Sequence, residues 1–203
     1  MRCRCARALP RCSLWGQAFW PSTSLSACPP VPGGRCCDRL ARRLLGRRAS
    51  SVFSPPARLL LEATQYAQVR PYGLSRQAFG LLPKVREVDR LLSPSWQATV
   101  YEAHPELAFA ALAGRPLAAS KKTRAGRQAR LHLLQSAPEA WLRQLGEALA
   151  ALPPLPRSQA APDDLLDAAV LTRTAYRIAT GQATCLPPAP PRDARGLRMA
   201  IWY

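Results

Sequence analysis

Three carboxylates stand at positions where two predicted elements could present them to metal ions. Glu102 follows the β-prone residues 98–101, so it lies at the carboxyl end of a predicted strand. Asp164 and Asp167 are three positions apart on a predicted helix and therefore share one of its faces. Carboxylate oxygens suit Mg²⁺ or Mn²⁺, and two such ions about 3.5–4 Å apart can activate water and stabilise a leaving oxygen. Ordinary helix capping by the same acids is the alternative interpretation.

Four cations follow Glu102 in a short stretch and could bind phosphate groups. They are Lys121, Lys122, Arg124 and Arg127. Because Lys and Arg supply many of the contacts that proteins make to nucleic-acid phosphates, we predict a phosphate-binding cluster here. A solvated basic face without a ligand is the alternative.

Three other polar residues have both a chemical and a structural interpretation. His104 could act as a general base, or it could fix the turn after Glu102. Asp38 and Arg42 lie one helical turn apart, where a surface ion pair would contribute little to stability.

The pattern around these residues predicts one central strand between helical blocks. Residues 98–103 favour the strand, and Pro105 suits the first turn of a helix that Gly114 ends. Apolar residues at intervals of three and four predict the other helices. These cover residues 38–45, 57–68, 75–92 across Pro83, 127–135, 138–152 and 162–180, and a closing strand or docked tail covers residues 197–203.

The charge of the chain indicates a polyanionic partner. Its 203 residues suit one domain, and 29 Lys and Arg against 12 Asp and Glu leave a net charge of +17. Such a field attracts nucleic acid, DNA or RNA, with an affinity that falls as salt rises. The sequence contains no phosphate-binding glycine loop or dinucleotide fingerprint, so we expect no small-molecule cofactor. No run reaches the roughly 18 apolar residues of a membrane helix, so we expect no membrane partner.

Residues 1–33 differ from the rest of the chain. They contain five Pro residues, no acid and no periodic pattern, so we predict a disordered or aberrant basic segment outside a domain at residues 34–203. A secretory signal is the alternative, although polar residues interrupt its apolar part. Six of the seven Cys residues precede residue 38, without C-x-x-C spacing. The odd count and the adjacent pair at 36–37 favour reduced thiols in a cytoplasmic protein over disulfides or zinc.

Short motifs in a fixed order resemble the bacterial proteins grouped as domain-of-unknown-function family 429, predicted nucleases with an RNase H-like fold. The resemblance covers about residues 34–203. Its central part is Glu102-Ala103-His104-Pro105-Glu106, Phe109, Gly114, Pro116-Leu117, Ser120-Lys121-Lys122, Gly126-Arg127 and Arg130-Leu131; its outer parts are Gly34-Arg35, Asp38, Ala41-Arg42, residues 50–53, Pro55-Pro56, residues 163–168, residues 196–199 and residues 201–203.

The resemblance implies metal-dependent hydrolysis of phosphodiester bonds. The Asp-x-x-Asp-Ala pattern is also similar to the late acidic pair of RuvC-type resolvases. On the matching positions, the family implies catalysis and Mg²⁺ or Mn²⁺ binding at Glu102, Asp164 and Asp167. It also implies phosphate binding by the Lys121-Lys122 loop and further motif positions at Asp38, Arg42, His104 and Glu106.

One part of the family pattern is missing. Family members usually open with a strand that bears an acid, and residues 1–37 contain neither Asp nor Glu. We therefore expect an α/β, RNase H-like domain that is helix-rich and incomplete, with its first strands missing, and a nuclease that is weak or inactive. The alternative function is a non-catalytic basic protein that binds nucleic acid or another macromolecule.

Overall fold

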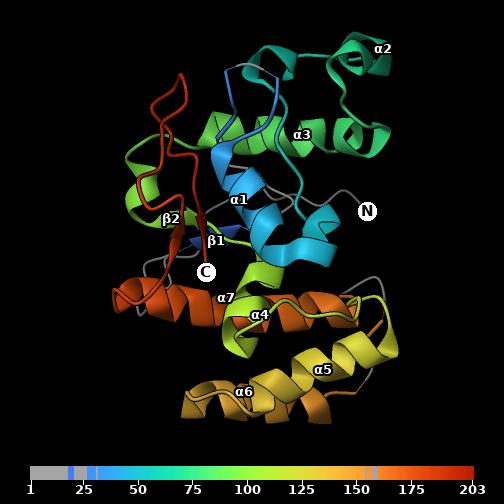
Figure 1. Cartoon of the computed structure of the whole chain (residues 1–203), viewed down its shortest axis with the longest axis vertical. Helices are drawn as coiled ribbons and strands as arrows, with labels where there is room; N and C mark the ends of the chain where they lie inside the picture. Colours follow the sequence, from blue (N-terminus) through green and yellow to red (C-terminus); the bar gives the residue numbers. More distant parts are fainter. Residues whose placement is uncertain (1–17, 21–26, 31, 154, 157–159) are drawn as a thin grey trace.

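The computed structural model describes residues 18–20, 27–30, 32–153, 155–156 and 160–203. Helices dominate it, and short strands make it an α/β mixture (Figure 1). The elements are β1 (Ala18–Trp20), α1 (Cys36–Leu45), η1 (Gly46–Ser51), η2 (Arg58–Leu60), α2 (Tyr66–Val69), η3 (Arg70–Tyr72), α3 (Arg76–Leu91), η4 (Trp96–Ala98), β2 (Val100–Glu102), α4 (Pro105–Ala113), α5 (Arg124–Gln135), α6 (Ala140–Ala151), α7 (Pro162–Ala179), β3 (Cys185–Leu186) and β4 (Ile201–Trp202).

The strands form two small sheets that meet beside β2. Strand β1 pairs with β2 in parallel, with Trp20 opposite Glu102, and β3 pairs with β4 antiparallel. A parallel bridge between Ala103 and Trp202 joins the two regions. The predicted strand at residues 98–103 is confirmed in a shorter form, because η4 takes residues 96–98.

The described part of residues 1–33 departs from the prediction that this range lies outside the folded core. It supplies β1, and Ala27 and Cys28 are buried. Arg35, which is also buried, donates to the carbonyl of Ala27 at 3.3 Å, and Asp193 accepts a hydrogen bond from the Cys28 amide at 3.2 Å. Polar contacts to Arg35 and Asp193 therefore hold residues 27–28 in the fold, and such contacts cannot be predicted from the periodicity of apolar residues. The rest of residues 1–33 lies outside the described residues.

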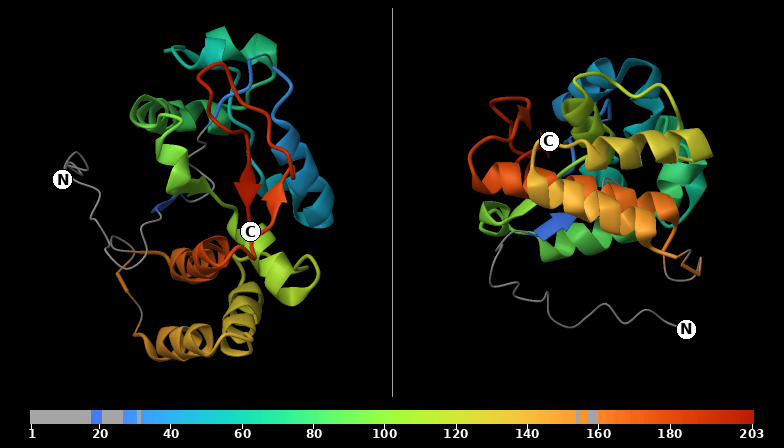
Figure 2. Two further views of the ribbon diagram at one scale, coloured as in Figure 1. Left: turned by 90° about the vertical axis from the view of Figure 1, so that its left-hand side faces the viewer. Right: turned by 90° about the horizontal axis from the view of Figure 1, so that it is seen from below.

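Two large clusters of buried side chains lie on either side of α4. Helices α5, α6 and α7 pack together at one end of the molecule, and α2 and α3 lie at the other (Figures 1 and 2). The first cluster contains residues from α1, β2, α4 and the last strands; its buried members are Ala27, Cys37, Ala41, Leu45, Val52, Val88, Leu92, Val100, Leu107, Leu186, Leu197, Met199 and Ile201. The second comes from α4 to α7; its buried members are Ala108, Phe109, Leu134, Ala137, Leu142, Leu166, Ala169 and Val170.

The helix that follows Glu102, α4, forms as predicted. Pro105 is the first residue of α4, where its missing N–H costs nothing, and Gly114 ends the helix with a φ of 68°. Helix α5 begins at Arg124, before the predicted start, because the Thr123 hydroxyl accepts the Gly126 amide at 3.0 Å. Helix α3 runs through Pro83 as one element.

The single helix predicted at residues 57–68 is wrong. The chain forms η2 there and then a separate α2. Gln68 accepts hydrogen bonds from the amides of Thr64 and Gln65 at 2.8 and 3.0 Å, which starts a new helix. The Arg86 guanidinium donates hydrogen bonds to the carbonyls of Leu61 and Ala63. Contacts to side chains thus replace the backbone bonds that a continuous helix needs.

Four cysteines fall within the described part of the chain, and all are free thiols: Cys28, Cys36, Cys37 and Cys185. Burial raises the pKa of Cys28 to about 12, which keeps that thiol protonated and unreactive. Among the described residues, no helix has both the length and the apolar composition needed to cross a membrane.

Candidate functional site

Glu102 is buried in an ion cluster with Arg35 and Asp38. Its Oε1 and Oε2 lie 2.5 and 2.7 Å from the two terminal nitrogens of Arg35. The same guanidinium lies 2.7 Å from Asp38 Oδ1. Burial lowers the pKa of Arg35, but Glu102 and Asp38 raise it more, so the guanidinium stays charged. The acid predicted to bind metal from the end of the strand therefore has an internal cation on both oxygens.

Asp38 and Arg42 do not pair with each other. Asp38 lies in the first turn of α1, where it accepts the Arg35 amide at 3.3 Å as well as the guanidinium. Arg42 instead donates to the carbonyl of Val52 at 2.8 Å and to the Ser54 hydroxyl at 3.0 Å. Both motif residues consequently fix α1 to its neighbours.

His104 fixes the turn after Glu102, which was one of its two predicted roles. It is the N-cap residue of α4, and its Nε2 lies 3.1 Å from the Ser51 carbonyl. Burial lowers the pKa of His104 more than the hydrogen bond to Ser51 and the nearby Glu106 and Glu102 raise it. The ring is therefore neutral at pH 7, Nε2 carries the proton that it donates to Ser51, and Nδ1 has no hydrogen-bond partner among the described residues.

Glu106 is held by a second buried arginine. Both of its oxygens accept from Arg130 Nη2, at 2.8 and 2.7 Å, and Arg48 lies 3.7 Å away. Arg130 also donates to the carbonyls of Ala119 and Gly126 at 3.1 and 2.8 Å. The pair therefore joins α4 to α5 and to the loop before it.

The two lysines of the predicted phosphate cluster are engaged by acids of α7. Lys122 Nζ lies 2.8 Å from Asp163 Oδ2. Lys121 Nζ contacts Asp167 Oδ2 and lies 3.9 Å from Asp163 Oδ2. The acids that converge are thus Asp163 and Asp167, four positions apart on one face of α7. Sequence reasoning gave Asp163 no chemical role, although its spacing to Asp167 was available as a signal.

The two acids respond to this environment in opposite ways. Burial alone would raise the pKa of Asp163, but the hydrogen bond and charge of Lys122 lower it below the ordinary value. At Asp167, burial raises the pKa and outweighs the opposing effect of Lys121, while Glu106 and Asp163 raise it further. Asp167 Oδ1 is buried and has no hydrogen-bond partner among the described residues.

Asp164 does not join Asp167. It is exposed, and its Oδ2 accepts the Ala161 amide at 3.2 Å, which closes the first turn of α7. A carboxylate at this position is favoured by the positive end of the helix dipole. The capping interpretation of the sequence is therefore the one that the structure adopts for Asp164.

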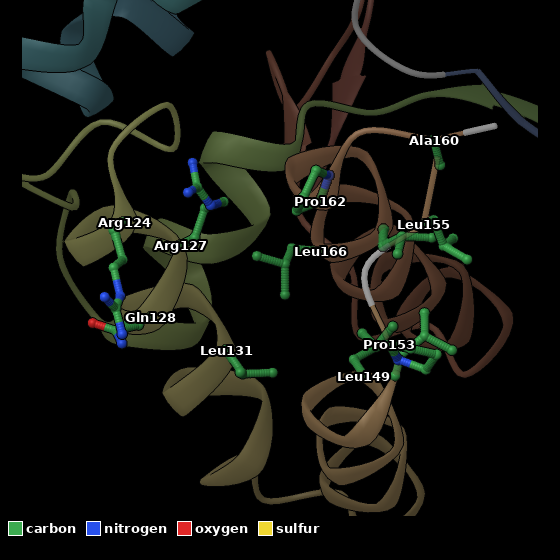
Figure 3. Close-up of a pocket in the computed structure, with 12 residues that line it drawn as sticks. Arg124, Arg127, Gln128, Leu131, Leu149, Pro153, Leu155, Ala160, Pro162 and Leu166 are labelled. Carbon is green, nitrogen blue, oxygen red and sulfur yellow. The ribbon is translucent and has the colours of Figure 1, made fainter. Parts of the chain in front are cut away.

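Arg124 and Arg127 are the members of the predicted phosphate cluster that make no ion pair among the described residues. Arg127 donates to the Lys122 carbonyl at 3.0 Å. Both arginines line a pocket of about 300 Å³ between α5, α6 and α7 (Figure 3). The cluster is thus divided, with two lysines on acids and two arginines at a pocket.

The predicted metal ligands do not fit a divalent ion in this arrangement. In the part of the chain that the structure describes, no three His, Cys, Asp or Glu side chains come together in a group that could hold one. Glu102 is occupied by Arg35, Asp164 caps its own helix, and Asp167 faces Lys121. A metal ion would have to displace an internal cation before it could bind these acids.

Comparison with known proteins identifies a family. No curated protein and no solved structure shows significant similarity to the chain. One family model, described as a protein of unknown function (DUF429), matches residues 19–192. The match begins within β1 and includes the elements that hold the candidate site, which are α1, β2, α4, α5 and α7. The chain therefore belongs to the DUF429 family of proteins of unknown function.

Proposed function

We propose that this chain binds nucleic acid through exposed arginines and hydrolyses it weakly or not at all. The observation that carries the proposal is the occupation of Glu102 and Asp167 by Arg35 and Lys121. It supports the non-catalytic alternative over the metal-dependent nuclease that family resemblance implied.

Metal-dependent hydrolysis would require costly rearrangement of the buried ion cluster. A divalent ion needs deprotonated ligands with free lone pairs, whereas both oxygens of Glu102 face a guanidinium. Removing one partner from a buried ion pair costs about 3–5 kcal/mol, because the remaining charge is left uncompensated in a low dielectric. The Arg35 side chain is fully buried, so it has no contact with solvent that could replace its bonds to Glu102 and Asp38.

A row of arginines on α1 and η1 provides the surface for the proposed binding. Arg39 and Arg43 are exposed four residues apart on α1, so they project from neighbouring positions along one side, and Arg47 is exposed in η1, directly after the change of direction at Gly46. None of the three forms an ion pair with another described residue; Arg39 donates only to the Gly34 carbonyl, at 3.1 Å. Together with the net charge of +17, this α1 arginine row can contact successive phosphates without losing internal partners.

The test is salt-dependent binding of labelled single-stranded, duplex and branched oligonucleotides, followed by fluorescence anisotropy. Replacing Arg39, Arg43 and Arg47 together by Ala should reduce the slope of log K against log salt for duplex DNA by roughly 2.7, or 0.9 per lost phosphate contact. The matched control replaces three exposed cations elsewhere, Arg70→Ala, Lys84→Ala and Arg90→Ala. Equal slopes for both triple variants would contradict a specific role for the row.

Cleavage of the same substrates is measured with Mg²⁺ and with Mn²⁺. We expect no cleavage by the wild-type chain above that of Glu102→Gln and Asp167→Asn. Efficient metal-dependent cleavage that Asp167→Asn abolishes would refute the non-catalytic proposal and restore the nuclease. Binding that is absent at low salt would refute both functions.

A further inference from the structure

The pocket between α5, α6 and α7 is lined by aliphatic side chains with a cationic rim (Figure 3). Nine of its twelve lining residues are Leu, Pro or Ala, and three are Arg124, Arg127 and Gln128. None of the described residues that line it is aromatic or acidic. Its volume of about 300 Å³ is at the lower end of the range for small-molecule sites.

The polar side chains of the rim come from one face of α5. Arg124, Arg127, Gln128 and Leu131 follow one another at intervals of three, one and three, so the face changes from cationic to apolar along the helix. Arg124 makes no hydrogen bond or ion pair with another described residue, and Arg127 uses one of its five donors on Lys122. The remaining donors are free for an anion, and the positive end of the α5 dipole adds to their field.

Aliphatic side chains from α6 and α7 complete the opposite wall. Leu149 and Leu152 come from the end of α6 and its C-cap position, and Leu165 and Leu166 come from the second turn of α7. Leu152 is 42% exposed, and Leu165 belongs to none of the buried clusters. An apolar ligand body would cover side chains that the fold itself leaves partly open to water.

We propose that this pocket binds an aliphatic carboxylate of medium chain length. The carboxylate accepts charge-assisted hydrogen bonds from Arg124 and Arg127, and the hydrocarbon chain packs among the leucines of α6 and α7. A nucleotide is a poorer match, because base recognition in such sites relies on aromatic stacking surfaces that this lining lacks. The pocket is separate from the α1 arginine row, so this inference does not depend on the proposed binding of nucleic acid.

A homologous series of ligands tests the apolar half of the site. Butanoate, hexanoate and octanoate are titrated into the full chain by calorimetry, below their micelle concentrations. Each buried methylene should tighten binding about fourfold, so each step of two should tighten it roughly sixteenfold until the pocket is full. Octylammonium, which carries the opposite charge on the same chain, should bind at least tenfold more weakly than octanoate. Equal binding of octanoate and octylammonium, or no dependence on chain length, would overturn the proposal.

Variants test the two halves separately. Replacing Arg124 and Arg127 by Ala should weaken octanoate binding at least tenfold and leave 1-octanol unchanged. Leu165→Ser should weaken both ligands about tenfold. The matched controls are Arg90→Ala and Leu91→Ser, two exposed residues away from the pocket, and thermal melting establishes that every variant is folded.

Two further results would overturn the assignment. One is an effect of the control substitutions as large as that of the pocket substitutions, since binding would then be non-specific. The other is displacement of octanoate by a deoxynucleoside monophosphate that binds more tightly, because the pocket would then take a nucleotide.

Discussion

Two of the ion-pair groups that the structure describes use similar residues in different surroundings. In the first, Arg35 and Asp38 have 0% and Glu102 has 2% side-chain exposure. In the second, Lys121 and Lys122 are 28% and 75% exposed, and their partners lie on α7. A buried cation cannot leave its acids without a large desolvation imbalance, whereas an exposed lysine exchanges its acid for water easily. The first group therefore fixes the fold, and only the second can be rearranged by solvent or ligand.

The largest expected effect comes from removing the buried cation. Arg35→Met leaves Asp38 and Glu102 as neighbouring buried carboxylates, so the free energy of unfolding should fall by about 3–5 kcal/mol in urea denaturation at pH 7. The control is Arg43→Met, at an exposed position of the same helix, which should change stability by less than about 0.5 kcal/mol. Stabilities that match in the two variants would mean that the buried group is dispensable.

A smaller effect distinguishes the two acids within the second group. The pKa of Asp163 is lowered on folding, so this acid stabilises the fold above its unfolded pKa and loses that contribution as pH falls through its folded pKa. The pKa of Asp167 is raised, so its contribution is fully present below its unfolded pKa and is lost as pH rises through its folded pKa.

Asn substitutions at these two positions should therefore have opposite dependence on pH. Between about pH 3 and 7, Asp163→Asn should become less stable relative to wild type as pH rises, and Asp167→Asn should become more stable relative to wild type. We expect each difference to remain within about 1 kcal/mol, because the lysine partners are partly exposed. Urea denaturation at closely spaced pH values measures both slopes, and slopes of equal sign would show that the acids share one environment.

The smallest effect is expected at Lys122. Its ammonium is mostly solvated, so Lys122→Met should lower the free energy of unfolding by about 0.2–1 kcal/mol at low salt. The loss should vanish in about 1 M NaCl, where the Debye length is only about 3 Å. Lys84→Met, at an exposed position without an acid partner among the described residues, is the control for a change in net charge. A loss of stability that persists in high salt would show that the Lys122 ion pair is shielded from solvent, as the pairs of Arg35 are.

Features with local causes were predictable from the sequence. The strand before Glu102, the start of α4 at Pro105 and its end at Gly114 each depend on the propensities of adjacent residues. The starts and ends of α6 and α7 were also close to prediction, because Pro and Gly mark them. Helix-rich α/β architecture follows from these elements, whereas the finer RNase H-like topology remains a prediction.

Features of the candidate site that depend on distant contacts were not predictable. Arg35 meets Glu102 across 67 positions of sequence, and periodicity carries no information about such a meeting. The choice between Asp163 and Asp164 depends on which acid turns back to cap α7 and which faces the lysine loop. The spacing places all the acids on the early turns of α7. It does not show which of them caps the helix and which pairs with a lysine, because both roles are favourable for an acid at this end of a helix.

The first buried cluster unites residues 27–52 with residues 186–201, whereas the second draws its buried members from residues 108–170 alone. During synthesis on the ribosome all the buried members of the second cluster are present once residue 170 has emerged, but the first cluster must wait for the final strands. At about 5–20 residues per second, the roughly 140 residues between α1 and β3 correspond to a delay of about 7–28 s. For that time the apolar residues of α1 lack the partners from β3 and β4 that will cover them, so the nascent chain is a candidate for chaperones that hold unfolded segments.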